Sequence, residues 1–66
     1  MKNWYVSRQY IAQDKIVTEY WVRDKQSWQS EQGGKGYTER GANYVHKLLF
    51  RKSCGLNNLS VTSYKI

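Results

Sequence analysis

The chain has 66 residues and a mass of 7.9 kDa, which is the size of one small domain and excludes a multidomain organisation. A domain of this size buries only about 60% of the surface that its unfolded chain exposes, so its core is small. Hydrophobic residues make up 39% of the sequence and aromatic residues 15%, which is too apolar for a disordered tail. We therefore expect a single folded domain over residues 1–66.

Positive charge is concentrated in the C-terminal part of the chain. Eleven Lys or Arg residues against five Asp or Glu residues give a formal net charge of +6. All five acidic residues precede residue 40, whereas residues 40–66 hold five basic residues and no acidic one. An uneven distribution of this kind attracts anionic partners. It indicates nucleic acid or an acidic protein surface as the partner.

Three features that the sequence lacks predict where in the cell the protein is located. There is no apolar run of about 18 residues that would form a membrane-spanning helix. The N-terminal residues have no apolar signal-peptide core. The single cysteine, Cys54, has no second cysteine with which to form an intrachain disulfide. These features predict a cytoplasmic protein that does not associate with membranes.

The first two segments predict a β-hairpin. Residues 4–11 and 16–23 are rich in aromatic and β-branched side chains, and a short polar connection joins them. Alternation along the second strand separates its side chains into two sets. We expect the helix-facing set to contain Ile16, Tyr20 and Val22. Trp21 and Arg23 then lie together on the opposite, exposed face.

The middle of the chain is polar and rich in glycine. Residues 24–32 contain Trp28 as their one large apolar side chain, and the pattern fits either a short edge strand over Ser27–Gln32 or an irregular loop. Three glycines within residues 33–36 interrupt regular structure. At the end of the chain, residues 59–66 alternate as a last strand, with Leu59 and Val61 on one side.

A helix is predicted between the glycines and the last strand. Thr38 is suited to be its N-cap, and Glu39 suits the positive end of the helix dipole. We expect Gly55 to be the C-terminal cap. The apolar stripe expected to face the sheet consists of Ala42, Val45 and Leu49, widened by Tyr44 and Leu48.

This order of elements predicts the fold class. It is an α+β fold with a small antiparallel sheet of three to four strands and one helix packed on one face, in the order β-β-(β)-α-β. Such an arrangement leaves the opposite face of the sheet open to solvent or to a partner.

The predicted helix also carries a basic stripe. At 100° per residue, Arg40, Lys47 and Arg51 project within about 40° of one another, and no acidic residue follows Glu39. A row of cations meets consecutive phosphates or an acidic protein patch. We therefore expect these three residues to contact nucleic acid.

Three further residues complete the predicted nucleic-acid-binding set. Lys35 lies in the glycine loop before the helix, where free backbone amides also favour anions. Trp21 and Arg23, if exposed together on the sheet, form a stacking surface for bases.

Catalysis and metal binding are not expected. His46 is the only histidine, and no nucleophile or acid partner for it is indicated. Cys54 lies near the helix C-terminus rather than the N-terminus, where a thiol pKa would be lowered. One His and one Cys do not provide the three or four ligands of a metal site. We expect a protein that is not an enzyme and that holds no cofactor or metal.

The segment Gly34-Lys-Gly-Tyr-Thr-Glu-Arg-Gly-Ala42 resembles the end of a double-stranded-RNA-binding domain. That family has Gly-x-Gly-x-Ser-Lys-Lys-x-Ala there, so Thr38 and Arg40 match the pattern, while Glu39 stands where a Lys is expected. The first helix of the family has no counterpart here, and the final strand is additional. The resemblance implies that Arg40 holds phosphates. In topology alone, the chain is similar to the arm-type DNA-binding domains of phage integrases.

Three functional hypotheses follow. The leading one is a small basic non-enzymatic protein that binds duplex DNA or RNA through phosphates. The alternative is a phage accessory or anti-defence protein, similar to anti-CRISPR inhibitors, which binds a host protein complex at its nucleic-acid site, with Trp21 as an aromatic anchor. The partner expected for this chain is accordingly nucleic acid or an acidic surface of a host protein complex. The third is a homodimer joined through an exposed sheet edge or sheet face.

Overall fold

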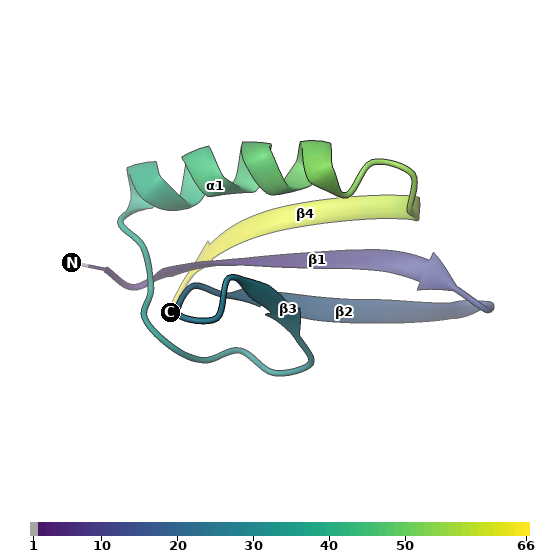
Figure 1. Cartoon of the computed structure of the whole chain (residues 1–66), viewed down its shortest axis with the longest axis horizontal. Helices are drawn as coiled ribbons and strands as arrows, with labels where there is room; N and C mark the ends of the chain where they lie inside the picture. Colours follow the sequence, from purple (N-terminus) through teal and green to yellow (C-terminus); the bar gives the residue numbers. More distant parts are fainter. Residues whose placement is uncertain (1) are drawn as a thin grey trace.

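The computed structural model describes residues 2–66 and contains one four-stranded antiparallel sheet and one helix. The elements in chain order are β1 (Trp4–Ala12), β2 (Lys15–Val22), β3 (Ser27–Gln29), α1 (Glu39–Lys52) and β4 (Asn57–Lys65). The strand order in the sheet is β3-β2-β1-β4, and α1 packs on β1 and β4 from one side (Figure 1). The predicted α+β fold is therefore confirmed, with β-β-β-α-β as its order.

A tight turn joins β1 to β2. Ala12 pairs with Lys15, and the two residues between them, Gln13 and Asp14, have φ angles of 52° and 61°. Two successive residues with positive φ form a turn of type I′, whose twist matches that of the adjoining strands. The turn thereby sets the register of the whole hairpin.

This register reverses the expected orientation of β2. Trp21 lies opposite Val6 of β1, and Val6 is completely buried in the core beneath the helix, so Trp21 faces the helix as well. The prediction that Ile16, Tyr20 and Val22 face the helix is wrong, and Ile16 is 72% exposed on the uncovered face. Alternation determines which residues share a face, but both faces of β2 carry large apolar side chains. The pattern therefore does not show which face the helix covers.

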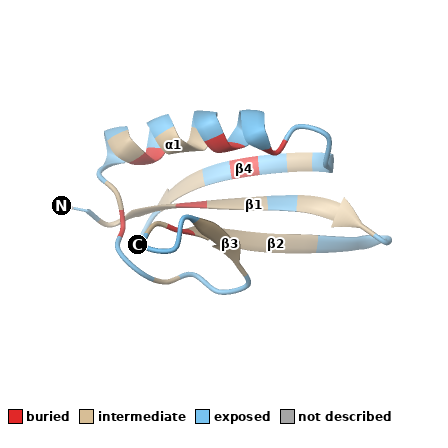
Figure 2. Cartoon of the chain, viewed as in Figure 1, coloured by how far each residue is buried: buried red, intermediate tan, exposed pale blue. Residues whose placement is uncertain are grey.

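The core lies between α1 and the sheet (Figure 2). Its buried residues are Val6, Ala42, Leu49 and Val61. Aromatic side chains surround this small aliphatic centre: the rings of Trp21 and Trp28 meet edge to face with 5.3 Å between their centroids, and Trp21 Nε1 donates a hydrogen bond to Tyr37 Oη at 3.1 Å. Partly buried aromatic residues thus supply apolar surface that the few aliphatic residues do not.

The ends of the secondary-structure elements depart slightly from prediction. β3 is a strand, as one of the two alternatives proposed, but it covers only the first half of Ser27–Gln32. Thr38 is the N-cap of α1, and its hydroxyl accepts a hydrogen bond from the Gly41 amide at 3.1 Å. The C-cap is Ser53 rather than Gly55. Gly55 lies in the following turn with a φ of 111°, where the absence of a Cβ avoids strain.

The apolar stripe of α1 is narrower than expected. Ala42 and Leu49 are buried as predicted, whereas Tyr44 is 70% exposed and Leu48 is 39% exposed. The assignment of Tyr44 to the core stripe is wrong because, at 100° per residue, it projects about 160° away from Ala42. Tyr44 therefore lies on the outer surface of the helix with the basic residues.

Arg8 of β1 pairs with Glu19 of β2 and also joins the sheet to the C-cap of α1. Arg8 Nε and Nη2 donate hydrogen bonds to Glu19 Oε1 at 2.9 and 2.7 Å, and Arg8 Nη1 donates to Ser53 Oγ at 2.9 Å. The guanidinium group also lies over the Trp28 ring, 4.2 Å from its centroid. With its side chain only 15% exposed, Arg8 has a structural role.

Tyr64 on the uncovered face of the sheet has an unfavourable hydroxyl environment. Its Oη is buried and makes no hydrogen bond within residues 2–66. Burial raises the pKa of the Tyr64 hydroxyl, and the neighbouring Tyr20 and Tyr5 raise it further. A buried polar group without a partner costs about 1–3 kcal/mol, so this hydroxyl opposes folding.

Replacing Tyr64 with Phe should therefore raise the free energy of unfolding by about 1 kcal/mol at neutral pH. Because the pKa of Tyr64 is higher in the folded state, the wild-type protein keeps its full stability below the ordinary pKa of 10.0 and loses stability as pH rises through the folded value. The Tyr64→Phe variant should lose less stability over the same rise in pH. Urea unfolding at neutral and at alkaline pH measures both effects, and a variant less stable than wild type at neutral pH would contradict the argument.

Candidate nucleic-acid interface

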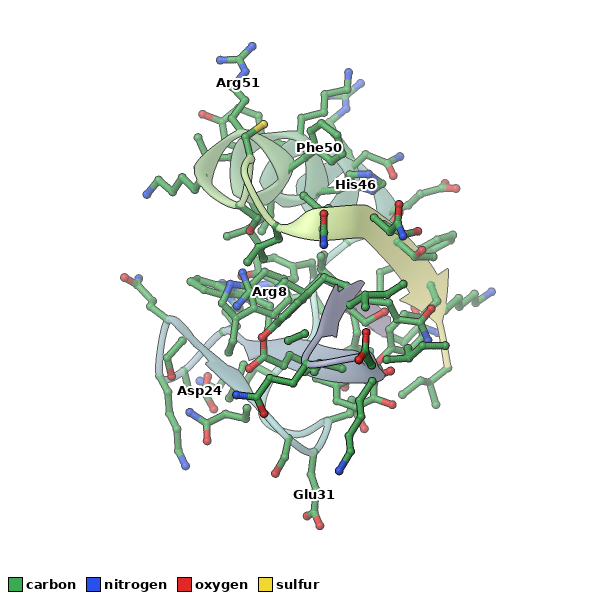
Figure 3. The ribbon with its side chains drawn as sticks, turned by 90° about the vertical axis from the view of Figure 1, so that its right-hand side faces the viewer. Arg8, Asp24, Glu31, His46, Phe50 and Arg51 are labelled. Carbon is green, nitrogen blue, oxygen red and sulfur yellow. The ribbon has the colours of Figure 1, made fainter. Side chains whose placement is uncertain are left out.

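The outer surface of α1 carries three exposed cations. Arg40, Lys47 and Arg51 are all exposed, because they project away from the side of the helix that packs on the sheet. Figure 3 shows Arg51 pointing away from the sheet, on the opposite side of the molecule from Glu31. The structure thus brings these three predicted residues together on one surface.

An exposed aromatic residue lies among these cations. Tyr44 projects about 40° from Arg40 around the helix and lines a shallow hollow of about 420 Å³ together with Arg40 and Lys47. The sequence analysis missed Tyr44 as a site residue, although its spacing of four residues from Arg40 is the signal that identifies it. We call Arg40, Tyr44, Lys47 and Arg51 the basic row. An aromatic ring next to a guanidinium group is a typical stacking surface for a base.

One acidic side chain, Glu39, lines the same hollow as Arg40 and Lys47, and the other four acidic residues lie outside α1. Within residues 2–66, the one ion pair is that of Arg8 with Glu19, so no carboxylate neutralises the basic row by direct contact. Asp24 and Glu31 lie on the far side of the molecule from the helix (Figure 3). Glu39 occupies the first turn of α1, where it stabilises the positive end of the helix dipole. Within residues 2–66, no cation of the basic row is therefore engaged in an ion pair.

Lys35 remains accessible near the start of the helix. It is exposed in the loop between β3 and α1, three residues before the N-cap Thr38. The loop itself is held in place, because Trp4 and Tyr37 exchange two backbone hydrogen bonds at 3.0 and 2.7 Å. Lys35 is thus presented by an anchored segment.

Arg23 and Trp21 lie apart from the basic row and have structural contacts. Arg23 Nη1 donates a hydrogen bond to the Gly36 carbonyl at 2.9 Å, and its guanidinium group lies 5.2 Å from the centroid of the Tyr37 ring. Both residues border a hollow of about 380 Å³ between α1 and the sheet. The expected exposed position of Trp21 is wrong, because the register of β2 turns its ring towards the core. Arg23 anchors the glycine loop instead of extending an exposed stacking surface.

The two residues considered for catalysis do not form a common site. Cys54 is exposed, and its Sγ donates a weak hydrogen bond to the Phe50 carbonyl at 3.5 Å. His46 is half-buried and projects from the side of α1 that lies above β4 (Figure 3). Within residues 2–66, no three His, Cys, Asp or Glu side chains are grouped so that they could hold a metal ion. In the same part of the chain, no helix has the length and apolarity needed to cross a membrane.

Comparisons of this chain with protein-family models, with curated proteins and with solved structures find no match. In the structure, the segment Gly34–Ala42 forms the end of the glycine loop and the first turn of α1. The fold and its surface together define a small α+β domain that exposes a basic helix. Functional inference accordingly starts from the geometry of that helix.

Proposed function

We propose that the protein binds nucleic acid through the basic row, mainly by contacts to phosphates, and catalyses no reaction. The observation that supports this proposal is the alignment of three exposed cations along one side of α1 without a carboxylate in contact. A helical rise of about 1.5 Å per residue separates Arg40 from Lys47 by roughly 10 Å and Lys47 from Arg51 by roughly 6 Å. Duplex DNA carries about one negative charge per 1.7 Å of its axis, so several phosphates lie within reach of such a row.

The proposed contacts carry little sequence information. Arg and Lys side chains on phosphates orient a protein on the duplex, whereas base edges in the grooves specify sequence. Tyr44 adds a ring on which a base of any type stacks. We therefore expect binding to be largely independent of sequence, with Lys35 adding a fourth cationic contact beside the helix.

Binding should weaken steeply as salt increases. Three or four phosphate contacts release condensed counterions and predict a slope of roughly −3 to −4 in a plot of log affinity against log salt for duplex DNA. Fluorescence anisotropy with duplex DNA, duplex RNA and single strands between about 50 and 200 mM salt measures this slope. An affinity that stays constant over this range would contradict a phosphate-dominated interface.

The second candidate function is that of a phage-type anti-defence protein that inhibits a host protein complex. Exposed apolar side chains on α1 favour it, because Tyr44, Leu48 and Phe50 are 70%, 39% and 45% exposed, and exposed aromatic residues are common binding hot spots. Trp21 is not the anchor, since its ring packs in the core. The nucleic-acid site of a host complex is itself basic, so a chain with a net charge of +6 would be repelled from it. Charge therefore favours direct nucleic-acid binding.

A further inference from the structure

β4 is an edge strand whose outer side has no partner within residues 2–66. The Asn3 carbonyl accepts a hydrogen bond from the Ile66 amide beyond the end of β4, and the adjacent Trp4 directs its backbone groups to Tyr37 on the other side of β1. Trp4 and Lys65 therefore form a non-hydrogen-bonded pair. By alternation along the regular part of β4, three residues direct their N–H and C=O groups to the free edge: Val61, Ser63 and Lys65.

Apart from an irregularity at the start of β4, this edge lacks the features that normally prevent strand pairing. β4 contains no proline, and its only charged residue, Lys65, lies at its end. The register shifts between Gln9↔Ser60 and Ile11↔Asn57, which leaves one extra residue in β4 near Asn58, whose φ is 52°. The regular segment is therefore Ser60–Lys65, about 20 Å long. Proteins usually protect a long exposed edge with charges, prolines, bulges or a covering element. The opposite edge of the sheet is different, because β3 is only three residues long.

We propose that β4 pairs antiparallel with β4 of a second copy of this chain and joins the two four-stranded sheets into one. A twofold axis at Thr62 places Ser63 of one copy opposite Val61 of the other, and Lys65 opposite Leu59. No like charges then face each other across the interface, although each chain carries a net charge of +6. The two edges are self-complementary, as a twofold interface requires.

The same arrangement brings the two helices into contact. Because α1 packs over β1 and β4, its axis lies roughly half a strand spacing inside β4, and a strand spacing of about 4.8 Å places the two helix axes roughly 10 Å apart. This is close to the ordinary distance between packed helices. The same twofold axis therefore allows the two β4 strands to pair and the two helices to pack.

An exposed apolar side chain lies where the helices would meet. Phe50 is 45% exposed and projects from the side of α1 above β4 (Figure 3). Asn43, two helical turns earlier on that side, accepts a hydrogen bond from Ser63 of β4 at 3.1 Å. The dimer covers Phe50 of both copies. It also places both basic rows on the same face of the joined sheet.

The mass of the free protein in solution tests this proposal independently of nucleic acid. Sedimentation of wild type at increasing protein concentration should show the mass rising from the 7.9 kDa of the monomer towards twice that value. Added salt should strengthen the association, because it screens the repulsion between two positively charged copies. Nucleic-acid binding should weaken with added salt, whereas dimerisation should strengthen. Either proposal can therefore be contradicted without affecting the other.

Two variants locate the interface. Thr62 is exposed, and in the proposed dimer Thr62 of one copy faces Thr62 of the other across the twofold axis. Thr62→Lys therefore places two like charges opposite each other and should keep the protein monomeric. Ser30→Lys adds the same charge at an exposed position after β3 and should dimerise as wild type does. Phe50→Ser should weaken the dimer by about tenfold or more. Circular dichroism verifies that each variant is folded.

A wild-type protein that stays at 7.9 kDa up to about 1 mM would overturn the proposal. Dimers that persist unchanged in both Thr62→Lys and Phe50→Ser would also overturn it, because they would assign self-association to another surface. So would a dimer that Ser30→Lys disrupts as strongly as Thr62→Lys.

Discussion

Replacing Arg40, Lys47 and Arg51 together with Glu should abolish binding to DNA and RNA of every sequence alike. Each lost phosphate contact costs about 1 kcal/mol in water, and the three new carboxylates repel the phosphates, so affinity should fall by at least about a hundredfold. The loss of affinity should be the same for every nucleic-acid sequence, because phosphate contacts carry no sequence information. Fluorescence anisotropy with several duplexes and single strands measures it.

A matched variant separates the basic row from net charge. Lys2, Lys15 and Lys25 are exposed and lie outside α1, so replacing these three with Glu changes the charge by the same amount. This control should retain most of the affinity. Both triple variants should unfold at nearly the wild-type temperature, because all six positions are exposed. Retained binding in the helix variant, or an equal loss in both, would contradict the assignment of the basic row.

Gly36→Ala should cause the largest loss of stability, about 3 kcal/mol. A Cβ on Gly36 would clash with the backbone carbonyl of Lys2 and would lie 3.1 Å from the carbonyl oxygen of Trp4. Backbone atoms cannot turn aside as a flexible side chain does, so the loop must move away from β1. That movement breaks the hydrogen bonds between Trp4 and Tyr37 and shifts the carbonyl that accepts from Arg23.

Urea unfolding measures this loss, with Gly33→Ala as its control. No atom lies within 4 Å of a Cβ built on Gly33, so that substitution should change the free energy of unfolding by less than about 0.5 kcal/mol. A domain of this size has a total stability of roughly 3–10 kcal/mol, so Gly36→Ala brings it close to unfolding. Equal stability of the two variants would show that the loop adapts without cost.

The helix and its basic residues are predictable from the sequence because their determinants are local. The N-cap Thr38 bonds an amide three residues away, and the helical period alone aligns Arg40, Lys47 and Arg51. The same period also separates Tyr44 from Ala42, so the exposed ring was within reach of sequence reasoning. The strands of the hairpin likewise follow from their composition and from a short connection.

Only the tertiary structure decided which side of the sheet is covered and which edge is free. Trp21 lies on the helix side because β2 pairs with β1 in a register that sets it opposite Val6, and α1, from a distant part of the chain, covers Val6. The free edge of β4 depends on the order of all four strands. When a strand carries large apolar side chains on both faces, its alternating pattern is the same whichever face is buried. Contacts between residues far apart in the sequence therefore select the buried face, and with it the roles of Trp21 and Arg23.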